Sequence, residues 1–154
     1  MKRNTALLIA GAFLASFTAR EALSHCQIPC GIYDDPTRFV LMAEHIATIE
    51  KSMKTIIELS AEEKPDYNQL VRWVANKDHH ADELSEIVTY YFMAQRIKPP
   101  EAEGDQARAK YLEQITSLHQ MLVYSMKAKQ TTELENVEKL RALLESFRAS
   151  YLAQ

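Results

Sequence analysis

The stretch PTRFVLMAEHIATIEKSMKTII, residues 36–57, has the pattern that decides the fold. Its apolar residues recur at alternating steps of three and four, at Phe39, Met42, Ile46, Ile49, Met53 and Ile56. This spacing is typical of an amphipathic helix that buries one face. We expect Asp35 to cap the helix and Pro36 to occupy its first turn, where proline is well tolerated. The stretch therefore predicts a helix that starts near Pro36 and ends before the polar residues 62–65.

Three further stretches have helical periodicity. One runs from about Asp66 to Ile97, one starts near Asp105, and one opens at Thr131-Thr132, where Thr132 and Glu135 fit a capping box. Their apolar stripes are, in chain order, Leu70, Val74, Ala81, Leu84, Val88 and Tyr91; Tyr111, Ile115, Leu118, Leu122 and Met126; and Leu134, Val137, Leu140, Leu144, Phe147 and Tyr151. Lys77 and Asp78 fall in a gap of the first of these stripes. Short connections force neighbouring helices antiparallel, so the sequence predicts an all-α, up-and-down antiparallel four-helix bundle.

The composition excludes several other classes of protein. The chain has 154 residues with 47% hydrophobic and 25% charged residues, which is an ordinary globular balance for one domain. It contains only three glycines, too few and too scattered for a glycine-rich phosphate loop or for the turns of a β-rich fold. The net charge of −3 gives no bulk attraction to nucleic acid, so no nucleic-acid partner is expected.

Residues 1–24 have the pattern of a removable leader. A basic head, MKRN, precedes the apolar run TALLIAGAFLASF at residues 5–17, which is short for a membrane span of about 20 residues. Ala22 and Ser24 have the spacing of a signal-peptidase site. We therefore expect cleavage before His25, leaving a mature domain of residues 25–154 with no stable membrane anchor.

Residues 25–35, HCQIPCGIYDD, are predicted to form a hook rather than a helix, because Pro29 and Gly31 bracket Cys30. Both cysteines of the chain, Cys26 and Cys30, lie in this hook. Their chemistry leaves three possibilities open. They could form a disulfide, as in many exported proteins. They could form a thiol redox pair, although that motif normally has two intervening residues and here there are three. They could bind a metal together with the imidazole and free amine of His25, a donor set that suits Cu(II) or Ni(II).

The nine residues His25–Tyr33, HCQIPCGIY, resemble the signature His-Cys-x-x-Pro-Cys-Gly-x-Tyr of the nickel superoxide dismutases. The resemblance implies a four-helix bundle whose N-terminal hook holds one nickel ion per subunit. Cys26 and Cys30 would supply thiolates, and the amine of His25 and the amide nitrogen of Cys26 would complete a square plane around Ni(II). The His25 imidazole would bind axially to Ni(III). Tyr33 would be the catalytic tyrosine near the open face of the metal, ordering water and limiting anion access, although it could instead pack the hook on the bundle.

The resemblance also implies activity and assembly. The reaction is the nickel-dependent disproportionation of superoxide to dioxygen and hydrogen peroxide, an antioxidant defence, by a homohexamer that a maturation peptidase trims. The leader suggests an exported or periplasmic protein, and cytoplasmic trimming is the alternative. Two other functions stay open: an exported bundle with a Cys26–Cys30 disulfide, and a copper or nickel carrier without turnover.

Some positions depart from the family pattern. Gln27 replaces an acidic residue that is common after the first cysteine, and Met42 falls where some members place a glutamate beside the axial imidazole. Glu44 and Arg72 are the nearest candidates for the partners of that imidazole. The remaining histidines, His45, His79, His80 and His119, are predicted to lie on the surface, since they do not form the paired Glu-x-x-His motifs of a di-iron bundle.

Overall fold

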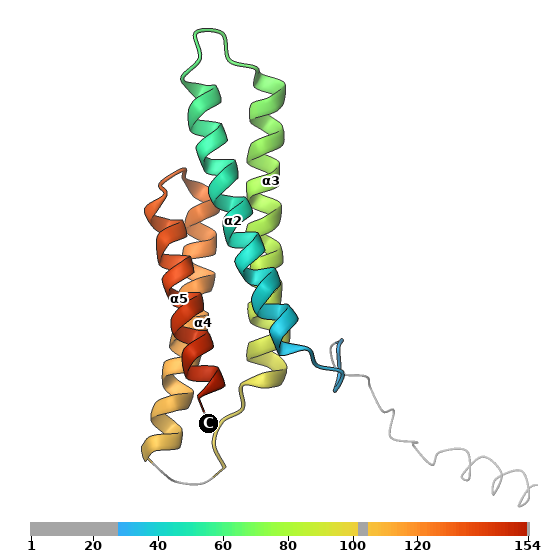
Figure 1. Cartoon of the computed structure of the whole chain (residues 1–154), viewed down its shortest axis with the longest axis vertical. Helices are drawn as coiled ribbons and strands as arrows, with labels where there is room; N and C mark the ends of the chain where they lie inside the picture. The colour runs from blue at the N-terminus through green and yellow to red at the C-terminus, as the bar shows by residue number, and fades with distance from the viewer. Residues whose placement is uncertain (1–27, 102–104, 154) are drawn as a thin grey trace, which may run out of the picture. The chain divides into compact units, whose positions relative to one another are not determined.

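The computed structural model describes residues 28–101 and 105–153, and most of them are helical (Figure 1). The elements are α2 (Asp35–Ser60), α3 (Tyr67–Glu86), the π-helix η1 (Ile87–Arg96), α4 (Asp105–Gln130) and α5 (Glu135–Leu152). The largest contacts join α2 to α3 and α4 to α5, and contacts of α3 with α4 and of α2 with α5 close the bundle. The described residues contain no strand, and the predicted all-α four-helix bundle is confirmed.

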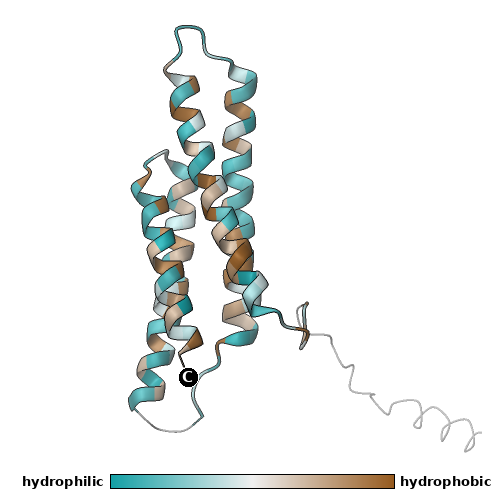
Figure 2. Cartoon of the chain, in the orientation of Figure 1, coloured by the Kyte–Doolittle hydropathy of each residue, from teal (hydrophilic) through white to brown (hydrophobic). Residues whose placement is uncertain are grey.

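Helix α2 buries the stripe that the sequence predicts. Its buried apolar residues are Phe39, Met42, Ile46, Ile49, Met53 and Ile56. Figure 2 shows apolar and hydrophilic stretches alternating along each helix, as expected for amphipathic helices. The predicted cap is wrong by one residue: Asp34, not Asp35, accepts a hydrogen bond from the Thr37 amide at 3.1 Å. Asp35 begins the helix itself, so its carboxylate is available for another role.

The second predicted helix is continuous but not uniform. Asp66 caps α3 by accepting hydrogen bonds from the amides of Asn68 and Gln69, and after Glu86 the helix continues as η1. The predicted positions Ala81, Leu84, Val88 and Tyr91 are buried, whereas Val74 is 41% exposed. The stripe therefore describes the middle of the bundle and fails at the start of α3.

Lys77, which the stripe leaves in a gap, is buried with only 3% of its surface exposed. Its ammonium donates hydrogen bonds to the carbonyl oxygens of Ala128, at 2.7 Å, and Lys129, at 2.5 Å, and contacts the Asp78 carboxylate at 2.9 Å. Carbonyl groups at a helix end have no partner within the helix. Lys77 thus closes the end of α4 from a neighbouring helix.

The last two helices also differ from the prediction in detail. In α4 only Leu118 of the predicted stripe is fully buried, and Met126 is 54% exposed. The buried face of α4 also contains small or polar residues: Gln114, Ser117, Ser125 and Ala128. Helix α5 starts at Glu135, and the predicted Thr132–Glu135 capping box is absent from it. The Thr131 hydroxyl instead accepts a hydrogen bond from the Glu133 amide at 3.3 Å.

No helix among the described residues combines the length and apolarity needed to cross a membrane. The proposed leader, residues 1–24, lies outside them, as do His25 and Cys26.

Candidate functional site

Residues 28–35 of the predicted hook are described, and residues 28–31 form a turn. Cys30 has a φ of +36° and Gly31 a φ of +88°, so both occupy the left-handed region. A methyl group on Gly31 would meet no atom within 4 Å, so the glycine is required by its backbone angle rather than by space. Cys30 is exposed, and its sulfur is a soft donor of the kind nickel thiolate sites need. The turn predicted from Pro29 and Gly31 is confirmed for these residues.

Cys30 is the one predicted nickel ligand that lies among the described residues. His25 and Cys26 lie outside the described residues, so their role as ligands stays a prediction. Within residues 28–101 and 105–153, no three His, Cys, Asp or Glu side chains are grouped to hold a metal ion.

Tyr33 lies on the surface of the bundle and is not a core residue. It is 38% exposed, and its ring is held from two sides. The Arg96 guanidinium lies 4.4 Å from the ring centroid, in cation–π geometry, and the Tyr91 ring meets it edge-on at a centroid distance of 5.8 Å. Two residues of η1 therefore hold the ring of Tyr33, three residues after Cys30.

Asp35 joins these residues to the far end of the chain. Its Oδ1 accepts hydrogen bonds from the Tyr91 hydroxyl at 2.5 Å and the Arg96 Nε at 2.9 Å. Its Oδ2 accepts from the Arg96 Nη2 at 2.6 Å and the Tyr151 hydroxyl at 2.7 Å. We call these four residues the Asp35 cluster. Through it the first turn of α2 is joined to η1 and to the last turn of α5.

The protonation states of the Asp35 cluster follow from these contacts. Burial acts to raise the pKa of Asp35, but hydrogen bonds from Arg96, Tyr91 and Tyr151 outweigh it and the pKa is lowered. Burial, together with the hydrogen bond to Asp35, raises the pKa of Tyr91 and of Tyr151 to about 12 each. The hydrogen bond to Asp35 also raises the pKa of Arg96. At neutral pH the carboxylate and guanidinium are therefore charged, and both tyrosines act as donors.

The π-helix η1 explains how Tyr91 and Arg96 reach the same carboxylate. In an α-helix, residues five apart are separated by about 140° around the axis. In a π-helix hydrogen bonds join residues five apart, so such residues lie above one another. The bond from the Ile97 amide to the Phe92 carbonyl, at 2.9 Å, has this spacing. The π-helix thus points both side chains at Asp35.

The Asp35 cluster was not predicted from the sequence. Asp35 was expected to be a cap, Tyr91 and Tyr151 were expected to be core residues, and Arg96 had no expected role. The doublet Asp34-Asp35 was a usable signal, because a helix start needs only one capping carboxylate. The candidate partners of the imidazole, Glu44 and Arg72, are exposed and are not in the cluster, and Met42, where some family members place a glutamate, is fully buried in the core.

The other histidines are only partly as predicted. His79 and His119 are exposed, but His45 and His80 are half-buried. Their Nδ1 atoms lie 2.8 Å apart across α2 and α3, so the prediction of surface histidines is wrong for this pair. Two imidazoles on adjacent helices meet here because position 45 of α2 and position 80 of α3 lie at the same level.

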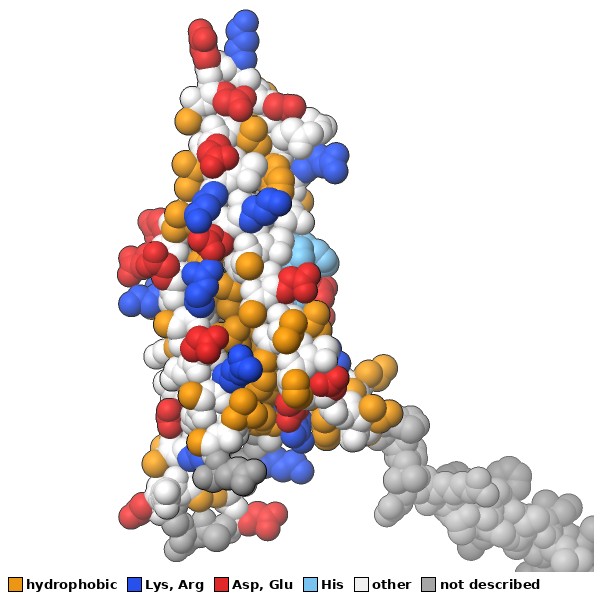
Figure 3. Space-filling view, in the orientation of Figure 1, with side chains coloured by type: hydrophobic (Ala, Val, Ile, Leu, Met, Phe, Trp, Pro, Cys, Tyr) orange, Lys and Arg blue, Asp and Glu red, His pale blue; other side chains and the backbone are white. Residues whose placement is uncertain are grey.

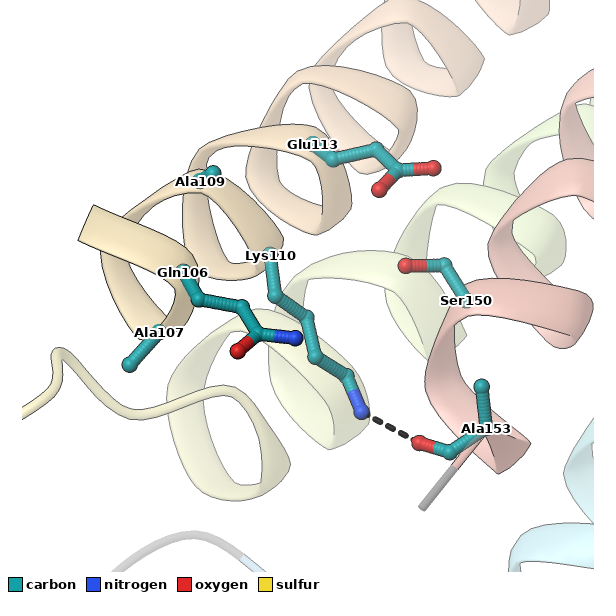
Figure 4. Close-up of a pocket in the computed structure, with 7 residues that line it drawn as sticks. All are labelled: Gln106, Ala107, Ala109, Lys110, Glu113, Ser150 and Ala153. Carbon is teal, nitrogen blue, oxygen red and sulfur yellow. Dashed lines mark hydrogen bonds between the residues drawn. The ribbon is translucent and has the colours of Figure 1, made fainter. Parts of the chain in front are cut away.

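A cavity of about 620 Å³ lies between the start of α4 and the end of α5, and none of the histidines lines it (Figure 4). Lys110 extends across it and donates a hydrogen bond to the carbonyl of Ala153, beyond the last turn of α5. Its other polar lining residues are Gln106, Glu113 and Ser150. These lining residues include no nucleophile paired with a base, and Lys110 satisfies a carbonyl at the end of α5.

Comparisons with known proteins agree with the motif in the hook. The family model described as nickel-containing superoxide dismutase matches residues 20–154, which include the hook and all of the bundle. Neither the curated proteins nor the solved structures gave a match. The family match confirms the resemblance carried by HCQIPCGIY. The chain therefore belongs to the nickel-containing superoxide dismutase family, whose members are oxidoreductases that use nickel to act on superoxide.

Proposed function

We propose that cleavage before His25 creates the active protein, which then disproportionates superoxide at a nickel ion held by the hook. The His25 amine and imidazole, the Cys26 amide and thiolate, and the Cys30 thiolate form the donor set. The observation that carries the proposal is the exposed left-handed turn at Cys30 and Gly31, within a motif that matches the family. This turn leaves the second sulfur accessible only five residues from the new terminus.

When bound, one nickel ion per subunit supplies redox chemistry between Ni(II) and Ni(III). Two anionic sulfurs and a deprotonated amide donate strongly and favour the higher oxidation state. The chain's own contribution is to hold the Cys30 donor in a turn outside α2, which Pro29 and Gly31 favour.

Tyr33 is proposed to order water and limit anion access beside the hook. Its ring packs against Arg96 and Tyr91, and these contacts hold the ring in one orientation. The positive charge of Arg96 beside this ring is compensated by Asp35, whose carboxylate lies 2.6 Å from the guanidinium. The Asp35 cluster therefore acts as the support of Tyr33 and not as a site of chemistry.

We propose that the mature protein is a homohexamer acting in antioxidant defence. An exposed apolar stripe supports assembly: Tyr67, Val71 and Val74 follow one another at helical spacing on the first turns of α3 and are 73%, 68% and 41% exposed. Figure 1 shows α2 and α3 extending beyond α4 and α5 at this end, so α4 and α5 do not cover the stripe. The leader supports export to the periplasm or beyond, with removal by a peptidase.

The decisive experiment compares two forms of one protein. Protein that starts at His25, verified by N-terminal sequencing, is expected to hold one nickel ion in its hook and to consume superoxide. The form with the leader retained lacks the free amine and is expected to lose nickel-dependent activity. Full activity of the uncleaved form would refute the mechanism. Thiol counting on the native protein identifies a disulfide-bonded bundle, because its sulfurs stay unreactive after metal removal. A metal carrier is identified by bound metal without turnover of superoxide.

A further inference from the structure

His45 and His80 form a contact that the superoxide reaction does not use. The two rings, from α2 and α3, have their centroids 5.1 Å apart and are tilted by 48°. Their Nδ1 atoms are 2.8 Å apart, so one nitrogen donates a proton and the other accepts it. Two imidazole nitrogens therefore lie close together and share a single proton.

The surroundings keep His45 in the form that binds metals. Burial lowers its pKa, and the neighbouring His80 lowers it further, which favours the neutral ring. Neutral imidazole is the common metal ligand. The carboxylates of Glu83, on α3, and Glu44, on α2, act in the opposite sense by favouring positive charge at this place. His79, on α3, lies beside them, with its Nε2 4.0 Å from Glu83.

The distance between the two nitrogens indicates which ions fit. Nitrogens bound at about 2.1 Å are about 3.0 Å apart when the angle at the ion is 90° and about 3.4 Å apart at a tetrahedral angle. The observed 2.8 Å is closer to the first value. Angles of 90° are found for Cu(II) and Ni(II) in square or tetragonal sites, whereas zinc prefers the tetrahedral angle.

We propose that His45 and His80 form a second metal site, which takes Ni(II) or Cu(II) once the shared proton has moved to the Nε2 of the ring that carries it, so that both rings stay neutral and both Nδ1 lone pairs are free to bind. The ion would be held by two imidazole nitrogens, with water in its remaining positions, because the described residues offer no third side chain grouped with them. Figure 3 shows histidine side chains reaching the surface on the α3 side of the bundle, so an ion can enter from solvent. The site is expected to be exchangeable and weaker than the hook.

The test uses the full chain with Cys26→Ser and Cys30→Ser, which removes both sulfurs from the hook. This parent is dialysed against Ni(II), and bound metal is measured per chain. One bound equivalent is expected, with at least a 10-fold loss of affinity in His45→Gln and in His80→Gln. His79→Gln and His119→Gln are the matched controls and should retain the metal.

Two results would overturn the proposal: a parent that binds no nickel or copper, and His45→Gln and His80→Gln variants that keep the full equivalent. Thermal unfolding of each variant checks that it is folded. If a variant fails to fold, histidine NMR on the folded parent decides, because Cu(II) should broaden the ring signals of His45 and His80 before those of His119. Broadening of His119 alone would also refute the site. Since both hook sulfurs are absent, the outcome is independent of the proposed dismutase mechanism.

Discussion

Asp35→Asn is the substitution that tests the Asp35 cluster most directly. Asparagine keeps the shape of the side chain but turns one acceptor oxygen into an NH₂ donor. Each oxygen of Asp35 accepts one hydrogen bond from Arg96 and one from a tyrosine, so the new NH₂ group must face an Arg96 donor. The side chains of Asp35 and Arg96 are 17% and 29% exposed. Removing one partner of a buried pair costs about 3–5 kcal/mol, and this exposure places the expected cost near the lower end, at about 3 kcal/mol.

Thermal and urea unfolding followed by circular dichroism measure this cost. For a domain of this size about 3 kcal/mol corresponds to a fall in Tm of roughly 10 °C. Asp34→Asn is the matched control, because the same change occurs one residue earlier at the helix cap. Asparagine caps a helix as well as aspartate does, so a change below about 0.5 kcal/mol is expected there. If the two variants unfold with free energies within about 0.5 kcal/mol of each other, the account of the Asp35 cluster is wrong.

Three further predictions concern a buried charge, the tyrosines and the hook. Lys77→Met should lower the free energy of unfolding by about 2 kcal/mol, since it leaves buried carbonyls at the end of α4 unpaired. Lys129→Met, which removes an exposed ion pair, should change it by less than about 1 kcal/mol, and equal effects in denaturant titrations would contradict this role. Tyr91 and Tyr151 should ionise near pH 12, seen as late absorbance changes at 295 nm that Tyr→Phe variants remove one at a time. Because the pKa of each tyrosine is raised from 10.0 in the folded protein, its hydrogen bond to Asp35 stabilises the fold fully below pH 10, and this contribution is lost as the pH rises toward 12. Tyrosines that all titrate near 10 in the folded protein would exclude this contribution. In a His45→Gln background, Cys30→Ser should abolish nickel binding by the mature protein while shifting the Tm of the metal-free protein by less than about 2 °C, and retained nickel would exclude this sulfur as a ligand.

Sequence patterns predicted the parts of the fold that depend on hydrophobic burial. The stripe of α2 is buried residue for residue, because α2 packs against both α3 and α5 through one continuous apolar face. The same argument failed in α4, where Gln114, Ser117 and Ser125 are buried among the neighbouring helices. The small side chains of Ser117 and Ser125 let neighbouring helices approach closely, and a periodicity that counts only large apolar residues misses such positions.

The site was predictable only where its chemistry is local in sequence. Nine adjacent residues carry the family motif, so no long-range contact was needed to find Cys30 or Tyr33. The Asp35 cluster joins residues up to 116 positions apart, and each member has an ordinary local explanation as a cap or core residue. Lys77 was missed for the same reason, since its carbonyl partners lie 51 and 52 residues away.

The π-helix η1 sets a limit on how the length of this protein can vary. Deleting one residue between Ile87 and Tyr91 would rotate Tyr91 and Arg96 away from Asp35 unless α3 moved along its axis to compensate. Deleting one residue between Tyr91 and Arg96 would return these two side chains to a spacing of four, which an ordinary α-helix aligns without any π-helical hydrogen bond. The segment is therefore equivalent to an α-helix with one residue inserted. The inserted residue is tolerated because Tyr91 and Arg96, on either side of it, both donate hydrogen bonds to Asp35. Lengthening or shortening the bundle should accordingly be easy at the α2–α3 connection and hard at the end of η1.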